Sequence, residues 1–448
     1  MMTWTRLLST SRLGKPDYTE QPNRPIYLQD LDRIAFSAPF RRLANKTQVH
    51  PLHQHDHVHH RLIHSMETAS VGRSLGMSIG HWLEQEDHIQ PGDKHVVSGM
   101  AQAACLAHDI GNPAFGHSGE EAIGQWFAAQ FTQSSHPLFT DLPDTHRPEF
   151  EAFEGNAQGF RIITRLEMYR NQGGMQLSHG VLGAFTKYGA TADVQTALKA
   201  ANGDKAPYCG LKKFGIFQSE TELFAEAAEA TGLIKEDGAQ GAWYRRHPLV
   251  FLVEAADDIC YNICDIEDAY TTGDLDFDTV VDILTPLIGR PNRAADDMTR
   301  AEQIAKLRAN GISAAVEAAI EAFQTHHDDI LAGRFNSSLV ETSAKAREFS
   351  DMVDLAQSRI FTGQRKIEME IYGRNLIHKV LDGILPVYEK LALAGWDANA
   401  LPAYEAQLVA ALNLDLRDVT DSDSALHSLA DFVSGMTDRY AVRVAEIF

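Results

Sequence analysis

Cysteine is scarce in this sequence, with 4 residues among 448. So few thiols cannot build a disulfide framework, which excludes the class of small secreted proteins that disulfide bonds hold together. Cys260 and Cys264 lie four residues apart, but no second cysteine pair accompanies them to complete a zinc site. We therefore interpret these two thiols, and that of Cys105, as small buried apolar groups.

Long apolar runs are also missing. No uninterrupted apolar stretch approaches the ~20 residues that a membrane-spanning helix needs. Residues 1–17 contain Arg6, Arg12 and Lys15 but no apolar segment, which argues against a secretory signal peptide. We expect a cytoplasmic protein that has no membrane partner.

An excess of positive charge is absent as well, because the formal net charge is −21. Proteins that bind nucleic acid without sequence preference need a basic surface to neutralise phosphates, so such binding is not expected as the main role. An anionic substrate stays compatible with this composition, since a few Lys and Arg side chains can set the local field of a pocket.

The composition is that of a globular protein, with 44% hydrophobic and 23% charged residues. The chain exceeds the roughly 250–300 residues at which one core stops growing, so we expect two cores or one elongated helical mass. Strand-like alternation is scarce, and the predicted fold class is all-α. We expect an N-terminal arm over residues 1–29, a catalytic core over 30–288 and a C-terminal helical region over 289–448, with 289–297 as the linker.

Apolar residues recur three or four positions apart in many segments, as in amphipathic helices. The pattern predicts helices over 60–84, 94–108, 149–170 and 248–270, and, after the linker, over 299–307, 313–325, 344–357, 366–390, 404–412 and 424–433. Pro248 suits the first turn of its helix. Residues 133–148 are predicted to form a loop.

The candidate chemistry is organised around residues 105–121. His108 and Asp109 end the helix predicted over 94–108, and Gly111 is suited to terminating it. An imidazole next to a carboxylate suits a divalent metal, although a His-Asp dipeptide alone is a weak signal.

The next helix is predicted to open at a capping box formed by Ser118 and Glu121. That start would place His117 just before the helix and Glu120 in its first turn. A histidine and a carboxylate at this position suit proton transfer.

Further metal ligands are predicted on two other helices. Asp257, Tyr261 and Asp265 share one face of the helix over 248–270, which is otherwise apolar. Buried carboxylates are costly unless they are paired or bound to metal, and a structural hydrogen-bond network is the alternative for this face. Two histidines and two aspartates from three helices would leave room for water, as hydrolytic metal chemistry requires: His64, His108, Asp109 and Asp257.

Several motifs around these residues resemble the bacterial dGTPase family, which are HD-domain deoxynucleoside triphosphate triphosphohydrolases. The motifs are Phe40–Leu43, Lys46–Val49, Arg61–Ser65, His108–Pro113, Gly119–Glu120, Phe153–Gln158, Phe185–Tyr188 and Glu254–Asp268. The detailed match spans residues 30–270. The resemblance implies an HD-domain helical core with additional C-terminal helices, and hydrolysis of dGTP or several dNTPs to a deoxynucleoside and intact inorganic triphosphate.

The resemblance also implies roles for individual residues. His64, His108, Asp109 and Asp257 would hold a divalent metal such as Mn, Mg, Co, Ni, Fe or Zn. His117 would give a proton to the leaving 5′-oxygen, and Glu120 would orient it. Arg61, Lys187, Tyr188 and Lys213 would bind the phosphates, whereas Gln48, Tyr261 and Asp265 would surround the sugar. Gly189 stands where relatives often have Pro, and no base contact is assigned to Phe361.

The expected partners are a dNTP substrate and further copies of the chain, in a homo-oligomer such as a hexamer, with weak single-stranded DNA binding as a secondary property. Two alternatives stay open: an HD-type nucleotidase that releases single phosphate, and a non-catalytic nucleotide-sensing or single-strand-binding oligomer. The tract that contains His53, His55, His57, His59 and His60 is interpreted as solvated polar residues and not as ligands.

Overall fold

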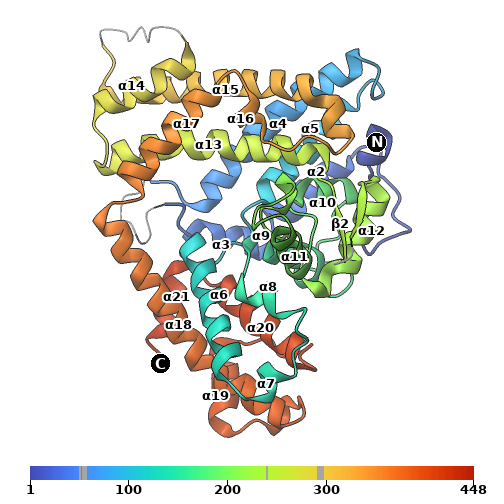
Figure 1. The fold of residues 1–448 in the computed structure, drawn as a ribbon, viewed down its shortest axis with the longest axis vertical. Coiled ribbons are helices and arrows are strands. Elements are labelled where there is room, and N and C mark those ends of the chain that lie inside the picture. The colour runs from blue at the N-terminus through green and yellow to red at the C-terminus, as the bar shows by residue number, and fades with distance from the viewer. Residues whose placement is uncertain (50–51, 53–57, 239–240, 290–296) are drawn as a thin grey trace.

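A computed structural model describes residues 1–49, 52, 58–238, 241–289 and 297–448 of the chain (Figure 1). These residues are mostly helical, so the all-α prediction is confirmed. The strands among them are β1 (Lys235–Gly238) and β2 (Gly241–Tyr244), which pair antiparallel. None of the described helices is long and apolar enough to cross a bilayer.

Three helices form the centre of the fold: α4 (Arg61–Gln85), α5 (Lys94–Ala107) and α13 (Pro248–Thr272). All three lie within a few residues of the predicted ranges. Pro248 is the first residue of α13, where its missing N–H costs nothing. The side chain of His247 accepts a hydrogen bond from the Leu249 N–H and so caps the same end.

Helices α4 and α5 approach each other very closely because glycines line the face of α4 that meets α5. Gly72, Gly76 and Gly80 are spaced four residues apart and share that face. A β carbon at Gly76 would lie 2.8 Å from the Cα of Ser98, and one at Gly80 would lie 2.7 Å from the Cα of Lys94. Such contacts with backbone atoms leave no room for a side chain, so the glycine face sets the distance between the two helices.

The other helices come before, between and after these three in the chain. Before α4 lie α1 (Trp4–Leu7), α2 (Ile26–Ala35) and α3 (Ala38–Arg42), and between α5 and α13 lie α6 (Gly116–Gln133), α7 (Pro137–Thr140), α8 (Arg147–Glu151), α9 (Gly155–Arg161), α10 (His179–Phe185), α11 (Ala192–Ala201) and α12 (Thr221–Thr231). After α13 come α14 (Phe277–Ile288), α15 (Arg300–Leu331), α16 (Leu339–Thr342), α17 (Ala346–Leu355), α18 (Gln364–Leu393), α19 (Ala403–Leu412), α20 (Ser422–Gly435) and α21 (Asp438–Ala445).

Several predicted boundaries are wrong. The helix expected over 149–170 stops at Glu151 and resumes at Gly155, because the Gly155 N–H donates to the Glu120 carboxylate and not to a helical carbonyl. The two helices expected over 299–307 and 313–325 are one helix, α15. The predicted loop over 133–148 contains α7, and α21 was not predicted. Residues 290–296 of the predicted linker lie outside the described residues.

Two apolar cores divide the molecule. The first surrounds α4, α5 and α13 and includes side chains of α14, α15 and α17. The second joins α6 to α18, α20 and α21, which form the lower half of Figure 1. The chain passes from the first core at Ile110 to the second at Ala114. The proposed domain limits at residues 29 and 288 stay a prediction.

The glycine face of α4 predicts the effect of a substitution. Replacing Gly76 with Val would press a branched side chain into the α5 backbone and should lower the free energy of unfolding by about 1–3 kcal/mol, as overpacking does. Urea unfolding followed by circular dichroism measures this change. Ser74→Val, on the exposed face of the same helix, is the matched control and should cost at most about 0.7 kcal/mol. Equal losses in the two variants would contradict the spacing role of glycine.

Candidate metal centre and active site

Three donor side chains converge where α4, α5 and α13 meet. His64 comes from the first turn of α4, His108 from the C-cap of α5 and Asp257 from the middle of α13. The Nε2 atoms of His64 and His108 lie 2.9 and 3.5 Å from the same oxygen, Oδ1 of Asp257. One donor atom from each residue lies within 4.8 Å of the others, which is the spacing of a metal-binding group.

The orientation of His108 is set by its own helix. Its Nδ1 lies 2.7 Å from the carbonyl oxygen of Cys105, so Nδ1 carries the proton and donates it to this carbonyl. The other ring nitrogen, Nε2, is buried and has no hydrogen-bond partner among the described residues. A backbone acceptor that fixes the tautomer of a histidine is a common support for metal ligands. The free Nε2 is thus aimed at the donor group.

Asp109 adjoins the same group and is held by two donors. Arg61 donates from Nη1 to Oδ2 at 2.7 Å, and Asn112 donates from Nδ2 to Oδ1 at 2.5 Å. Oδ1 also lies 3.6 Å from the Nε2 of His108. The residue therefore stands beside the three donors with its orientation fixed.

The electrostatics of this group favour a cation. Burial would raise the pKa of Asp257, but His108 and His64 hold it well below its usual range. Burial would lower the pKa of His108, yet Asp109 and Asp257 outweigh burial and raise it to about 9. The buried carboxylate of Asp109 and the half-buried carboxylate of Asp257 need a positive partner to remain ionised, and a divalent metal can supply more charge than an imidazolium.

Helix α6 starts differently from the predicted capping box. Phe115 precedes the helix in the left-handed region with φ 62°, and its N–H donates to Oδ1 of Asp438 at 3.1 Å. Its ring packs over Gly373 of α18, where a β carbon would lie 2.6 Å from the ring. Because the helix already begins at Gly116, Ser118 does not cap it, and His117 is its second residue.

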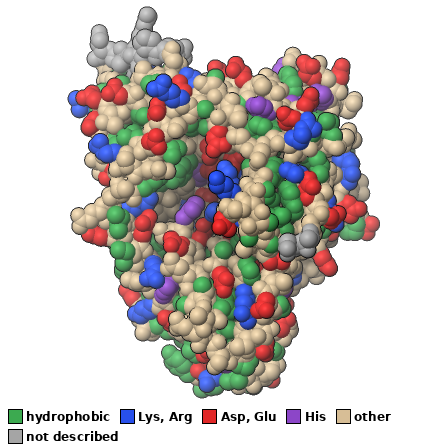
Figure 2. Space-filling model, viewed as in Figure 1, with side chains coloured by type: hydrophobic (Ala, Val, Ile, Leu, Met, Phe, Trp, Pro, Cys, Tyr) green, Lys and Arg blue, Asp and Glu red, His purple; other side chains and the backbone are tan. Residues whose placement is uncertain are grey.

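A cavity of about 170 Å³ opens beside the metal-binding group. Its wall contains the following predicted residues: His108, Asp109, His117, Glu120, Lys187, Tyr188, Lys213 and Asp257. Figure 2 shows a hollow near the centre of this face where acidic, basic and histidine side chains gather. The wall thus combines lysine side chains with carboxylates. This mixture suits a polyanionic ligand that binds together with its own cation.

The two lysines of this cavity are held by carboxylates that sequence reasoning did not assign. Nζ of Lys213 lies 2.8 Å from Glu154 and 3.7 Å from Glu120, and Nζ of Lys187 lies 3.2 Å from Glu254. Burial opposes the charge of Lys187, but Glu254 outweighs it and holds its pKa above the usual range. Glu154 and Glu254 stand inside the quoted motifs, and their position there is the signal that could have found them.

A second cavity, of about 260 Å³, lies on the other side of His117. Gln48, Arg61 and Tyr261 line it together with Phe361 and Lys366, whose Nζ lies 3.9 Å from the centre of the Phe361 ring. His117 belongs to the walls of both cavities.

Two predicted site residues, Asp265 and Glu120, have surroundings that differ from the prediction. Asp265 is buried and lines neither cavity, and its Oδ2 accepts no hydrogen bond among the described residues. Oε1 of Glu120 accepts from the Gly155 N–H at 2.9 Å, and no hydrogen bond joins Glu120 to His117 in the described part of the chain.

Comparisons with known proteins agree with this geometry. The HD domain family model matches residues 61–168, which contain His64, His108 and Asp109. Deoxyguanosinetriphosphate triphosphohydrolase-like proteins of Synechocystis sp. and Pseudomonas aeruginosa are each 37% identical to the chain. The match covers 98% of this chain and 97% of the Synechocystis protein, and 99% and 98% for the Pseudomonas protein. A Yersinia pestis protein named deoxyguanosinetriphosphate triphosphohydrolase is 28% identical, over 93% of this chain and 92% of its own.

The chain belongs to the dGTPase-like family of HD-domain proteins. This dGTPase-like protein is thus an HD phosphohydrolase related to dGTP triphosphohydrolases, and the HD domain implies a divalent metal. Its donor set fits such an ion, because the unpartnered Nε2 of His108 faces two carboxylates and a second imidazole.

Metal binding by the dGTPase-like protein can be tested at two adjacent aspartates. Asp257→Asn removes an anionic donor and should weaken Mn²⁺ binding by about 100-fold or more, given that even supporting residues contribute 10–100-fold. Isothermal titration calorimetry measures the affinity. Asp258→Asn makes the same chemical change one residue away, outside the donor group, and should leave the affinity within about threefold. The assignment fails if both variants bind Mn²⁺ as the unaltered protein does.

Proposed function

We propose that the protein hydrolyses deoxynucleoside triphosphates to a deoxynucleoside and intact inorganic triphosphate. One observation supports this proposal above the others: His117 lies between a polar cavity with the metal-binding group and a second cavity with aromatic residues. A nucleotide that spans the two would have its phosphates on one side of His117 and its nucleoside on the other. The names of the relatives agree with this substrate class.

A divalent metal held by His64, His108, Asp109 and Asp257 would lower the pKa of its bound water and offset the negative charge of the phosphates. The remaining chemistry belongs to side chains of the chain. Lys187, Lys213 and Tyr188 bind the phosphates, and Arg61 joins them from the start of α4. Charge-assisted hydrogen bonds of this kind are stronger than neutral ones and position the substrate for attack at the α-phosphorus.

His117 gives its proton to the 5′-oxygen that leaves. In the free protein its pKa is lowered, first by burial and then by the charges of Lys213 and Arg61. A bound triphosphate neutralises these cations, so His117 gains its proton when the substrate arrives. His117 therefore carries the proton that the leaving oxygen needs only when substrate is bound, which favours turnover of correctly bound substrate.

Glu120 supports the proton donor from the same helix. Burial raises the pKa of Glu120, and the Gly155 N–H and Lys213 hold its carboxylate in place. We infer that it orients His117 once the substrate has displaced Lys213 toward the phosphates.

The second cavity takes the nucleoside. The Oε1 atom of Gln48 is buried without a hydrogen-bond partner among the described residues, so it is free to accept from a ligand. We propose that Gln48 and Tyr261 pack around C2′ and leave no space for a 2′-hydroxyl, with Asp265 behind them. We also propose a homo-oligomer, such as a hexamer, with weak binding of single-stranded DNA.

The inorganic product decides between the proposed reaction and the alternative nucleotidase. Incubation with Mn²⁺, Mg²⁺ or Co²⁺ and each dNTP, singly and mixed, should release triphosphate that ion chromatography or ³¹P NMR identifies. Single phosphate as the first product would favour the nucleotidase. Nucleotide binding without any hydrolysis product would favour the non-catalytic alternative.

The role of His117 is tested by its replacement with Ala. Loss of a general acid lowers kcat by about 10²- to 10⁴-fold, and metal binding should be unchanged because His117 is not a donor to the metal. His95→Ala, an exposed histidine in the first turn of α5, is the matched control and should keep full activity. A fall in Mn²⁺ affinity that accounts for the lost activity would contradict a role in proton transfer.

A further inference from the structure

His59 differs from the solvated histidine that the sequence analysis expects. It stands just before α4, and its side chain is only 12% exposed. The interpretation of the tract as solvated polar residues is therefore wrong at this position, where burial against two helices replaces solvent. His53, His55 and His57 lie outside the described residues.

Asp268 of α13 accepts hydrogen bonds from both the backbone and the side chain of His59. One carboxylate oxygen accepts from the backbone N–H of His59 at 2.9 Å, and the other accepts from its Nδ1 at 2.8 Å. This arrangement fixes the rotamer of the ring and directs Nε2 away from Asp268. A carboxylate that orients the far nitrogen of an imidazole is a common feature of zinc sites.

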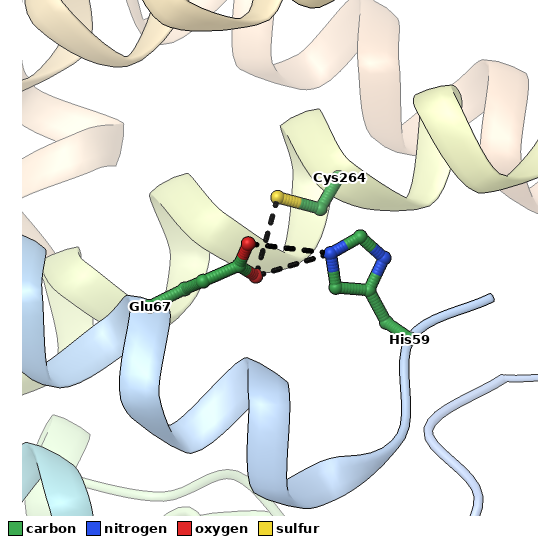
Figure 3. A group of neighbouring side chains, drawn as sticks. All are labelled: His59, Glu67 and Cys264. Atoms are coloured by element: carbon green, nitrogen blue, oxygen red, sulfur yellow. Dashed lines mark hydrogen bonds and ion pairs between the residues drawn. The ribbon is translucent and has the colours of Figure 1, made fainter. Parts of the chain in front are cut away.

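The freed Nε2 faces two further donors (Figure 3). The oxygens of Glu67, one turn into α4, lie 3.2 and 3.3 Å from it. Sγ of Cys264, from α13, lies 3.9 Å from Oε2 of Glu67. Donor atoms of the three residues lie within 4.8 Å of one another, as they do in the HD group.

The balance of charge around these residues is negative. Glu67 and Asp268 both face His59. The guanidinium of Arg308 pairs with Glu267 and also interacts with Glu67. One imidazolium and one guanidinium thus oppose the carboxylates of Glu67, Asp268 and Glu267 in a partly buried space, and a dication would offset this charge more fully.

We propose that His59, Glu67 and Cys264 form a second metal site, distinct from the HD group, that binds zinc through one nitrogen, one carboxylate oxygen and one thiolate. Imidazole with thiolate favours Zn²⁺ over the hard cations Mg²⁺ and Ca²⁺. Glu67, the most exposed of the three at 35%, leaves a path for the ion and a position for water.

Binding displaces two protons to solvent, one from Nε2 of His59 and one from the Cys264 thiol. Burial raises the pKa of this thiol, so without metal it stays protonated and donates weakly to Glu67. The ion would tie the residues before α4 to α13. Because Arg61 follows His59 by two residues, the site would steady the end of α4 that also carries His64.

Cobalt provides a direct test, since only the second site offers a thiolate. Co²⁺ added to the intact protein should produce a thiolate-to-cobalt charge-transfer band in the near ultraviolet. Asp257→Asn, which damages the HD group, should keep the band, whereas Cys264→Ser should abolish it. Cys260→Ser removes a buried thiol one turn earlier in α13 and is the matched control, in which the band should persist.

Zinc content provides the second measurement. After dialysis against limiting free Zn²⁺, Cys264→Ser should contain one ion per chain fewer than Cys260→Ser. No band in the intact protein, or a band that survives in Cys264→Ser, would overturn the proposal and leave these residues as an ion-pair network. The unaltered protein must itself show the band. Its absence there refutes the proposal whether or not the variants fold.

Discussion

The close approach of α4 and α5 is the constraint on which the site depends. Gly72, Gly76 and Gly80 lack a β carbon where α4 comes closest to Cys105, Ser98 and Lys94 of α5. His64 near the start of one helix and His108 at the end of the other are thereby brought to the same oxygen of Asp257. Dispersion contacts along the whole length of two helices thus set a distance that the donors need within a few tenths of an ångström.

A second set of contacts positions His117, the proposed proton donor. Asp438, at the start of α21, accepts from the N–H of Phe115 and from the backbone and hydroxyl of Thr47. Lys46 donates to the carbonyl oxygens of Asn112 and Ser434. These bonds connect the loop before His117, and the segment before Gln48, to helices more than three hundred residues later in the chain.

The residues of the candidate metal-binding group are predicted from the sequence, and the fold brings three of them together. His108 and Asp109 stand out as a motif, and Asp257 stands out because a carboxylate in an apolar helix needs a partner. Glu154 and Glu254 stand inside the motifs, but which lysines they pair with could not be predicted, since Lys213 and Lys187 are distant from them in sequence. The start of α6 was missed because nothing in the local pattern favours a left-handed Phe115, which tertiary contacts to Asp438 and Gly373 impose. His59 was misjudged for the same reason: a loop histidine is ordinarily solvated, and only the fold brings Asp268 and Glu67 to it.

The passage of the chain from one core to the other between Ile110 and Ala114 has a further consequence. The metal donors belong to the first core, whereas His117 and Glu120 belong to a helix of the second. The candidate site therefore lies at the seam between the two apolar cores. A shift of α18, α20 and α21 against the first core would move His117 relative to His64, His108 and Asp257. Under the proposed mechanism, the alignment of the two cores would govern proton transfer to the leaving group.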